Sequence, residues 1–173
     1  MKMTCRHDLR KRQARYAFTL AELLIVLVLM AVFSGGAIVA FRGRQKTYAL
    51  KMATSDLAVA IECAQSLARN NTLNSRLTFG PEYKKYRIER QSTIGLENYI
   101  SAAGRAGMER NIPGSVSISG ITIDGLPVTP APLTIGFPAS GNGFYGKIEL
   151  QNDLGEKMSV QIEKHTGQVL LSQ

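Results

Sequence analysis

One carboxylate stands at the edge of a long apolar segment near the start of the chain. Glu22 precedes a run of apolar residues from Leu23 to Phe33, and no charged residue follows before Arg42. As a helix, residues 23–41 extend roughly 28 Å, close to the hydrocarbon thickness of a bilayer. A carboxylate at the edge of such a segment costs a few kcal/mol, so it usually has a role. The chemistry open to Glu22 is an ion pair in a low-dielectric setting. In the alternative, the segment is an ordinary membrane anchor and Glu22 only contacts the lipid headgroups.

Catalytic chemistry has few candidates in this sequence. No zinc-type His/Cys cluster, Walker loop, HExxH or GxSxG motif occurs. Beyond residue 17 there is one cysteine, Cys63, and one histidine, His165. A Cys–His pair is conceivable, but Cys63 lies beside the apolar stripe of a predicted helix, where a packed structural thiol is the usual role. His165 fits a hairpin turn, and the glycine-rich segment 141–146 fits a turn better than a phosphate loop because no helix is predicted after it.

The residues around Glu22 resemble the processing site of type IV prepilins and pseudopilins. In that family a basic leader is cut before a Phe-Thr-Leu-x-Glu sequence, and the new amino-terminal Phe is methylated. The corresponding sequence here is Ala17-Phe18-Thr19-Leu20-Ala21-Glu22. The resemblance implies cleavage between Ala17 and Phe18, followed by N-methylation of Phe18. Ala17 replaces the usual glycine with another small residue.

The same resemblance gives Glu22 an assembly role that makes physical sense. Cleavage would create a free ammonium on Phe18, and a buried ammonium without a counter-charge is very costly. Glu22 is expected to pair with the Phe18 ammonium of a neighbouring subunit and so to set the axial register of a filament.

Shorter segments narrow the resemblance to minor pseudopilins of the GspH/FimT type. They are Asp56-Leu57 and residues 64–70, 112–116, 137–141 and 166–169. The end of the helix lacks the Ser-Glu pair often found in that group, because this chain reads Gln65-Ser66-Leu67. Many major pilins have a disulfide in their C-terminal region. After cleavage this chain would have a single thiol, Cys63, and so could form no internal disulfide. This favours a minor pilin or pseudopilin.

The periodicity of the chain predicts an α+β fold. Apolar or small residues recur every three or four positions from Leu50 to Leu67, which predicts an amphipathic helix with a stop at Asn70-Asn71. Residues 96–103 are predicted to form a short helix. Strands are predicted at 74–79, 83–89, 115–119, 121–124, 133–137, 146–151, 158–163 and 168–171. We therefore expect a long N-terminal helix, membrane-spanning in its first half, packed on antiparallel β-sheet.

Charge and length divide the chain further. The expected parts are a cleaved basic leader (1–17), a transmembrane and assembly helix (18–41), its amphipathic continuation (42–71) and a periplasmic β-rich domain (72–173). Five of the eight net positive charges belong to the leader, and four cations follow the apolar run, so basic residues flank both of its ends. Charge alone therefore favours a cytoplasmic leader only weakly. The resemblance favours a single pass of the inner membrane with the C-terminal domain outside the cytoplasm.

These observations predict a non-catalytic structural subunit of a type II secretion or type IV pilus-like filament, without cofactor or metal. The implied partners are other pilin-like subunits, a prepilin peptidase and an inner-membrane assembly platform. One alternative is a DNA-binding minor pilin for natural transformation, with Lys84, Lys85, Arg87 and Arg90 as the basic cluster. The C-terminal tail, where DNA-binding relatives carry basic residues, has no Lys or Arg after residue 164. A signal-anchored periplasmic enzyme is the third hypothesis.

Overall fold

The computed structural model describes residues 19–93, 98–128, 133–140 and 143–173, without the side chains of residues 34–42. The chain forms two compact units, residues 1–40 and 41–173. Helix α1 (Leu20–Asn71) runs through both units and ends at the predicted Asn70-Asn71 stop.

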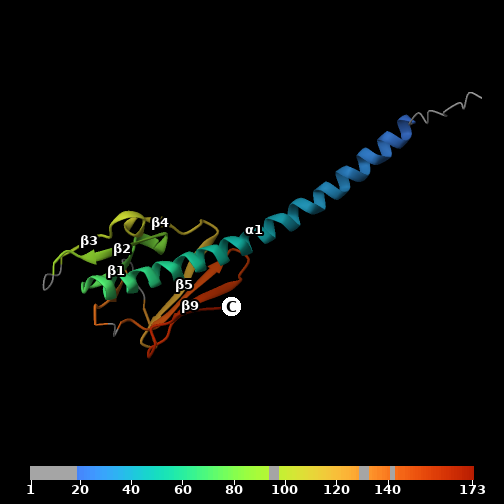
Figure 1. Ribbon diagram of the computed structural model, residues 1–173. Coiled ribbons are helices and arrows are strands. Elements are labelled where there is room, and N and C mark those ends of the chain that lie inside the picture. The colour runs from blue at the N-terminus through green and yellow to red at the C-terminus, as the bar shows by residue number, and fades with distance from the viewer. Residues whose placement is uncertain (1–18, 94–97, 129–132, 141–142) are drawn as a thin grey trace, which may run out of the picture. The chain divides into compact units, whose positions relative to one another are not determined.

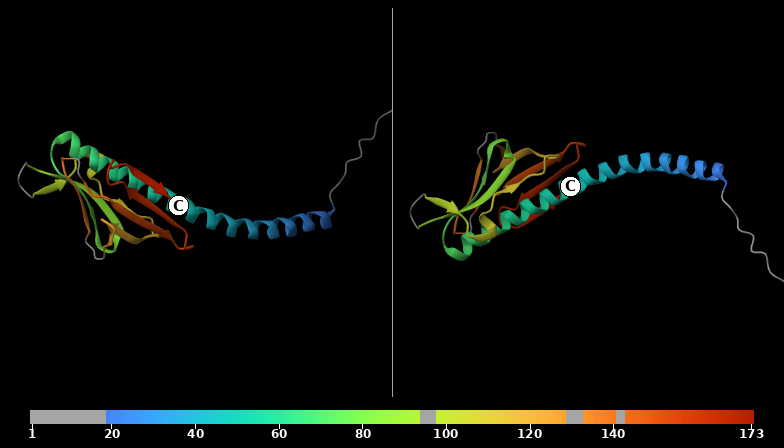
Figure 2. Two further views of the ribbon diagram at one scale, coloured as in Figure 1. Left: turned by 90° about the horizontal axis from the view of Figure 1, so that it is seen from below. Right: turned by 90° about the horizontal axis from the view of Figure 1, so that it is seen from above.

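In residues 41–173, the second half of α1 lies along two antiparallel sheets (Figures 1 and 2). The first sheet has the order β3-β2-β1-β7, with β4 also paired to β2, and the second has the order β10-β9-β8-β5-β6. The elements that follow α1 in the chain are, in order, β1 (Ser75–Phe79), the 3-10 turn η1 (Pro81–Tyr83), β2 (Lys85–Gln91), β3 (Tyr99–Ser101), the 3-10 turn η2 (Gly104–Gly107), β4 (Arg110–Asn111), β5 (Val116–Ile123), β6 (Leu126–Pro127), β7 (Thr134–Phe137), β8 (Gly146–Asn152), β9 (Lys157–Ile162) and β10 (Val169–Ser172). The predicted α+β architecture, a long N-terminal helix packed on antiparallel β-sheets, is confirmed.

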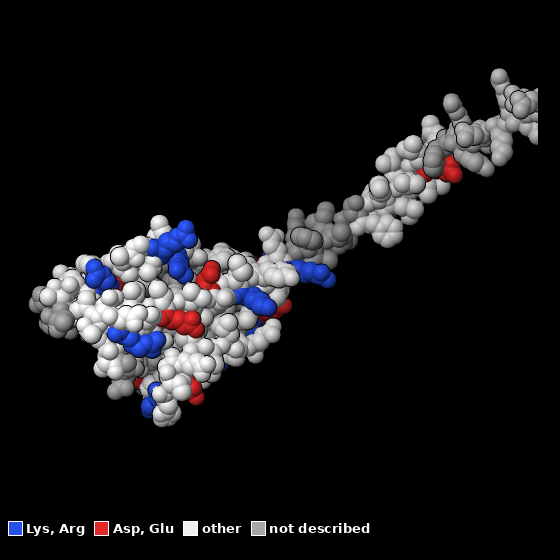
Figure 3. Space-filling model, viewed as in Figure 1, with Lys and Arg blue, Asp and Glu red and all other residues white. Residues whose placement is uncertain are grey.

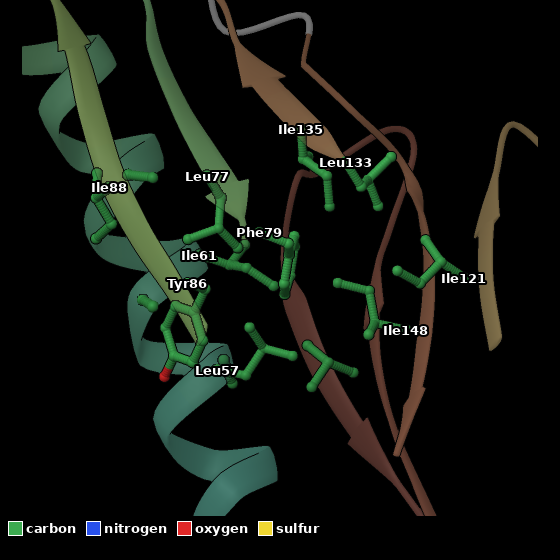
Figure 4. Packing of buried hydrophobic residues seen from close by; sticks show 14 of the residues in the cluster. Leu57, Ile61, Leu77, Phe79, Tyr86, Ile88, Ile121, Leu133, Ile135 and Ile148 are labelled. Carbon is green, nitrogen blue, oxygen red and sulfur yellow. The ribbon is translucent and has the colours of Figure 1, made fainter. Parts of the chain in front are cut away.

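The core lies between α1 and the inner faces of both sheets. The buried face of α1 follows the predicted spacing of three and four, because those positions lie on one side of a helix. Its buried residues are Leu50, Ala53, Thr54, Leu57, Ala58, Ala60, Ile61, Ala64 and Ala68. Figure 4 shows Leu57 and Ile61 in one cluster with Phe79 of the first sheet and Ile148 of the second. One apolar cluster therefore holds the helix and both sheets together.

Polar contacts fix the position of the helix along the sheets. The hydroxyl of Ser75, at the start of β1, donates to the carbonyl of Ala64 at 2.6 Å. Gln65 Nε2 donates to the carbonyl of Gly167 in the β9–β10 turn at 3.0 Å. Near the other end of this helical segment, Thr47 donates to Glu156 in the β8–β9 turn at 2.8 Å. These bonds tie two hairpin turns of the second sheet and the start of β1 in the first sheet to the helix.

Most strand predictions are confirmed, since β1, β2, β7, β8, β9 and β10 overlap the predicted runs. The first hairpin pairs β1 with β2 in antiparallel register, as the Gly80-Pro81 turn predicts. A further tight turn joins β5 to β6. Its central residues Asp124 and Gly125 have φ values of 52° and 81°. Two positive φ values in succession suit a hairpin whose strands twist to the right, and glycine tolerates the second without strain.

Two predictions about secondary structure are wrong. Residues 98–103 contain the strand β3 rather than a helix, while residues 94–97 lie outside the described residues. The strand forms because the edge of β2 is open there and the ring of Tyr99 lies under the Arg76 guanidinium, 4.0 Å away. Gly120 does not separate two strands either. It lies within β5, where the register with β8 shifts between Ile118 and Gly120, as in a β-bulge.

A buried carboxylate organises the outer face of the first sheet. Glu89 accepts hydrogen bonds from Arg76 Nε at 2.6 Å and Arg87 Nε at 2.7 Å, and its own side chain is 5% exposed. The Thr78 hydroxyl adds a third bond at 3.1 Å. Burial by itself raises the pKa of Glu89, but the hydrogen bonds and positive charges around it outweigh burial and hold the pKa below its usual value of 4.5.

Glu89 should therefore make stability depend on pH. Because its folded-state pKa is lowered, its contribution is fully present above pH 4.5 and is lost as the pH falls through the lower, folded value. We expect Glu89→Gln to lower the free energy of unfolding near neutral pH, with the difference from wild type shrinking in acid. Urea unfolding in detergent between about pH 7 and pH 3, followed by tyrosine circular dichroism, measures this. Glu62→Gln, at an exposed position, is the charge-matched control. A Glu89→Gln effect that is constant over this range would contradict the prediction.

Candidate functional site

The start of α1 holds the carboxylate singled out by the sequence. Thr19 directly precedes the first helical residue, Leu20, and Glu22 lies in the first turn. The backbone N–H and the hydroxyl of Thr19 both donate to Glu22 Oε2, each at 3.1 Å. In return, the Glu22 N–H donates to Thr19 Oγ1 at 3.3 Å. This reciprocal arrangement is a capping box, which satisfies backbone donors that a helix start otherwise leaves free.

The helix that follows Glu22 is apolar on all sides. The side chains of residues 23–33 are all exposed, including Leu23 at 57% and Phe33 at 75%. A helix that is apolar all round needs lipid or other helices around it, because exposing its apolar surface to water is unfavourable. Among the described side chains, no helix is both long and apolar enough to cross a membrane.

Ala17 and Phe18, the predicted cleavage and methylation residues, lie outside the described residues. Cleavage between them and the pairing of Glu22 with a neighbouring ammonium stay predictions.

The other sequence candidates do not form a common site. His165 lies in the β9–β10 turn and lines a small cavity of about 80 Å³ with Gln65 and Phe144. Cys63 is a half-buried free thiol on α1 that packs against the core and is absent from the described lining of that cavity. The segment 143–145 leads into strand β8, so its described part precedes a strand rather than a phosphate-binding helix. Within the described residues, no group of three or more His, Cys, Asp or Glu side chains is placed to hold a metal ion.

Three of the four residues of the predicted basic cluster at the first hairpin pair with carboxylates. Lys84 pairs with Glu82, Lys85 Nζ lies 2.7 Å from Glu109 Oε1, and Arg87 pairs with the buried Glu89. On the face of residues 41–173 seen in Figure 3, basic and acidic side chains are interspersed. Phosphate binding depends on uncompensated positive charge, so this arrangement gives no support to a nucleic-acid surface at β2.

Comparison with known proteins places these features in context. A model of the prokaryotic N-terminal methylation motif matches residues 12–38, which include Thr19 and Glu22. A solved structure of the minor pseudopilin EpsH from the type 2 secretion system of Vibrio cholerae superposes with a TM-score of 0.58 at 8% identity, covering 71% of this chain and 94% of that one. The fold is that of a minor pseudopilin. A crystal structure of the same Vibrio cholerae protein gives a TM-score of 0.54 at 10% identity, covering 71% and 92% of the two chains. Comparison with curated protein sequences finds no match.

The predicted resemblance is thus supported at both ends of the chain. The methylation motif belongs to the N-terminal segment, and the pilin-like α+β fold, which fits the GspH type, belongs mainly to the rest. Sequence reasoning missed one residue of the site, Thr19, because it assigned Glu22 to a neighbouring subunit alone. The signal was present, since Thr19-Leu20-Ala21-Glu22 has the Ser/Thr-x-x-Glu spacing of a capping box just before an apolar run.

Proposed function

We propose that this protein is a non-catalytic structural subunit, a minor pseudopilin or minor pilin of a type II secretion or type IV pilus-like filament. The observation that carries the proposal is the start of α1, where Glu22 stands before an apolar stretch, residues 23–33, whose side chains are all exposed. Such a helix requires an apolar environment, and the carboxylate at its edge requires a positive partner there. The methylation motif and the pseudopilin-like fold support the same function.

In this proposal the chain is first inserted into the inner membrane. Residues 23–41 carry no charge and serve as the single membrane pass, with the leader in the cytoplasm and the β-rich unit in the periplasm. A prepilin peptidase cuts between Ala17 and Phe18 and Phe18 is then methylated. An inner-membrane platform next moves the processed subunit into a filament of pilin-like subunits. There Glu22 pairs with the Phe18 ammonium of a neighbour, which specifies axial register more than it adds stability.

Processing at Ala17 is the direct test of this proposal. Co-expression with a prepilin peptidase should produce a mature chain that begins at methylated Phe18. Replacing Ala17 with leucine should block cleavage because a bulky side chain does not fit a pocket that accepts glycine or alanine, while Ala17→Gly should be cleaved at least as fast as wild type. Intact-mass spectrometry of the purified membrane fraction measures both. A mature terminus at any residue other than Phe18 would refute the processing step.

A further inference from the structure

Glu22 forms hydrogen bonds within its own chain, independently of any neighbouring subunit. Both of the bonds that it accepts from Thr19 end on the same oxygen, Oε2. Within the described residues, Oε1 has no hydrogen-bond partner. One carboxylate oxygen is therefore held by the N-terminus of its own helix, while the other stays available.

This division matters for assembly because a glutamate side chain has several freely rotating bonds. Freezing such a side chain when two subunits meet costs association free energy, and freezing it beforehand removes that cost. The Thr19 hydroxyl sits at the centre of the arrangement, since it donates to Oε2 and also accepts the Glu22 N–H at 3.3 Å. The Glu22 backbone and side chain are thus fixed by the same oxygen.

We propose that Thr19 is a positioning residue: it holds Glu22 Oε2 within its own chain so that Oε1 is presented to the ammonium of a neighbouring pilin-like subunit. The inference rests on the proposed function and adds a second residue to it. It also gives the Thr19 hydroxyl a role separate from simple capping. As a helix cap the hydroxyl accepts a backbone N–H, whereas in orienting Glu22 it is a donor that acts on Oε2 together with the Thr19 N–H.

Three substitutions at Thr19 separate orientation from capping. Thr19→Ser keeps the hydroxyl and both functions. Thr19→Val keeps the shape and the backbone N–H that donates to Oε2, but it loses the hydroxyl and with it the hydroxyl's part in both functions. Thr19→Gly loses the hydroxyl donor, yet glycine caps helices nearly as well as threonine. A residue that only caps the helix should therefore tolerate glycine, and a residue that positions Glu22 should not.

The experiment uses the full chain, expressed with its peptidase and filament machinery. Quantitative immunoblotting measures the fraction of processed protein that is recovered in sheared or crosslinked filaments. We expect Thr19→Ser to match wild type, and Thr19→Val and Thr19→Gly each to lower the filament fraction by roughly two- to tenfold. Normalising to the processed pool removes any effect on cleavage.

Each outcome decides between the two hypotheses. If Thr19→Gly assembles as well as wild type, Thr19 does not position Glu22, and a loss limited to Thr19→Val would identify it as a helix cap only. In that case a loss of assembly in Glu22 variants would leave the proposed function intact. If processed wild-type protein is absent from filaments, both the proposed function and this inference are wrong.

Discussion

Replacing Glu22 with alanine is expected to remove most of the protein from filaments while leaving the processed membrane pool nearly unchanged. Membrane insertion depends on apolar length, which this substitution slightly increases. In type IV prepilins and pseudopilins, which this chain resembles, the peptidase recognises mainly the residues that flank the cut. Incorporation differs, because a neighbour's ammonium would be left unpaired in a low-dielectric core. Removing one partner of a buried pair typically costs about 3–5 kcal/mol, which strongly disfavours docking.

Glu22→Gln sharpens this experiment because the structure separates two roles of the side chain. Glutamine can still accept the Thr19 bonds and complete the capping box, but it carries no charge. We expect it to assemble nearly as poorly as Glu22→Ala if the ion pair sets the register. Glu62→Ala removes an exposed carboxylate from the same helix and is the control for net charge. The measurement is the ratio of filament-bound to processed protein, and wild-type assembly by Glu22→Ala would exclude the charge-register mechanism for this subunit.

Phe79→Ala is expected to have the largest effect on folding. Phe79 is fully buried, and its ring contacts Tyr83 edge-on and Tyr86 at a tilt, with centroids 6.1 and 6.0 Å away. It also lies in the cluster that joins α1 to both sheets, shown in Figure 4. Truncating a buried phenylalanine removes apolar contacts and leaves a cavity, so the free energy of unfolding should fall by about 3–5 kcal/mol.

Urea unfolding of the full chain in detergent, followed by tyrosine circular dichroism, measures this loss. Leu126→Ala is the matched control, because Leu126 is a large apolar residue that is 69% exposed in the β5–β6 hairpin. Truncating it should change the free energy of unfolding by less than about 0.5 kcal/mol. Comparable losses in the two variants would mean that Phe79 is not the centre of the core.

The sequence determines the features that depend on near neighbours in the chain. The run of apolar residues after Glu22, the helix period from Leu50 to Leu67 and the stop at Asn70-Asn71 each involve residues within a few turns of one another. Strand alternation and glycine-containing turns are local as well, which is why six strands lie where the sequence predicts them. The capping box of Thr19 and Glu22 is equally local, and its spacing is readable once the helix start is known.

Tertiary structure decides what depends on residues distant in sequence. Residues 99–101 form a strand because the edge of β2 offers backbone partners and Arg76 covers the ring of Tyr99, neither of which a local pattern contains. The basic residues of β2 form a run in the sequence, but Glu109, contributed from beyond η2, and the buried Glu89 offset Lys85 and Arg87. Sequence order lists charges without their distances, whereas electrostatic energy depends on those distances. The sequence alone therefore contains the capping-box spacing at the start of α1, and only the folded unit shows which charges of β2 are already paired.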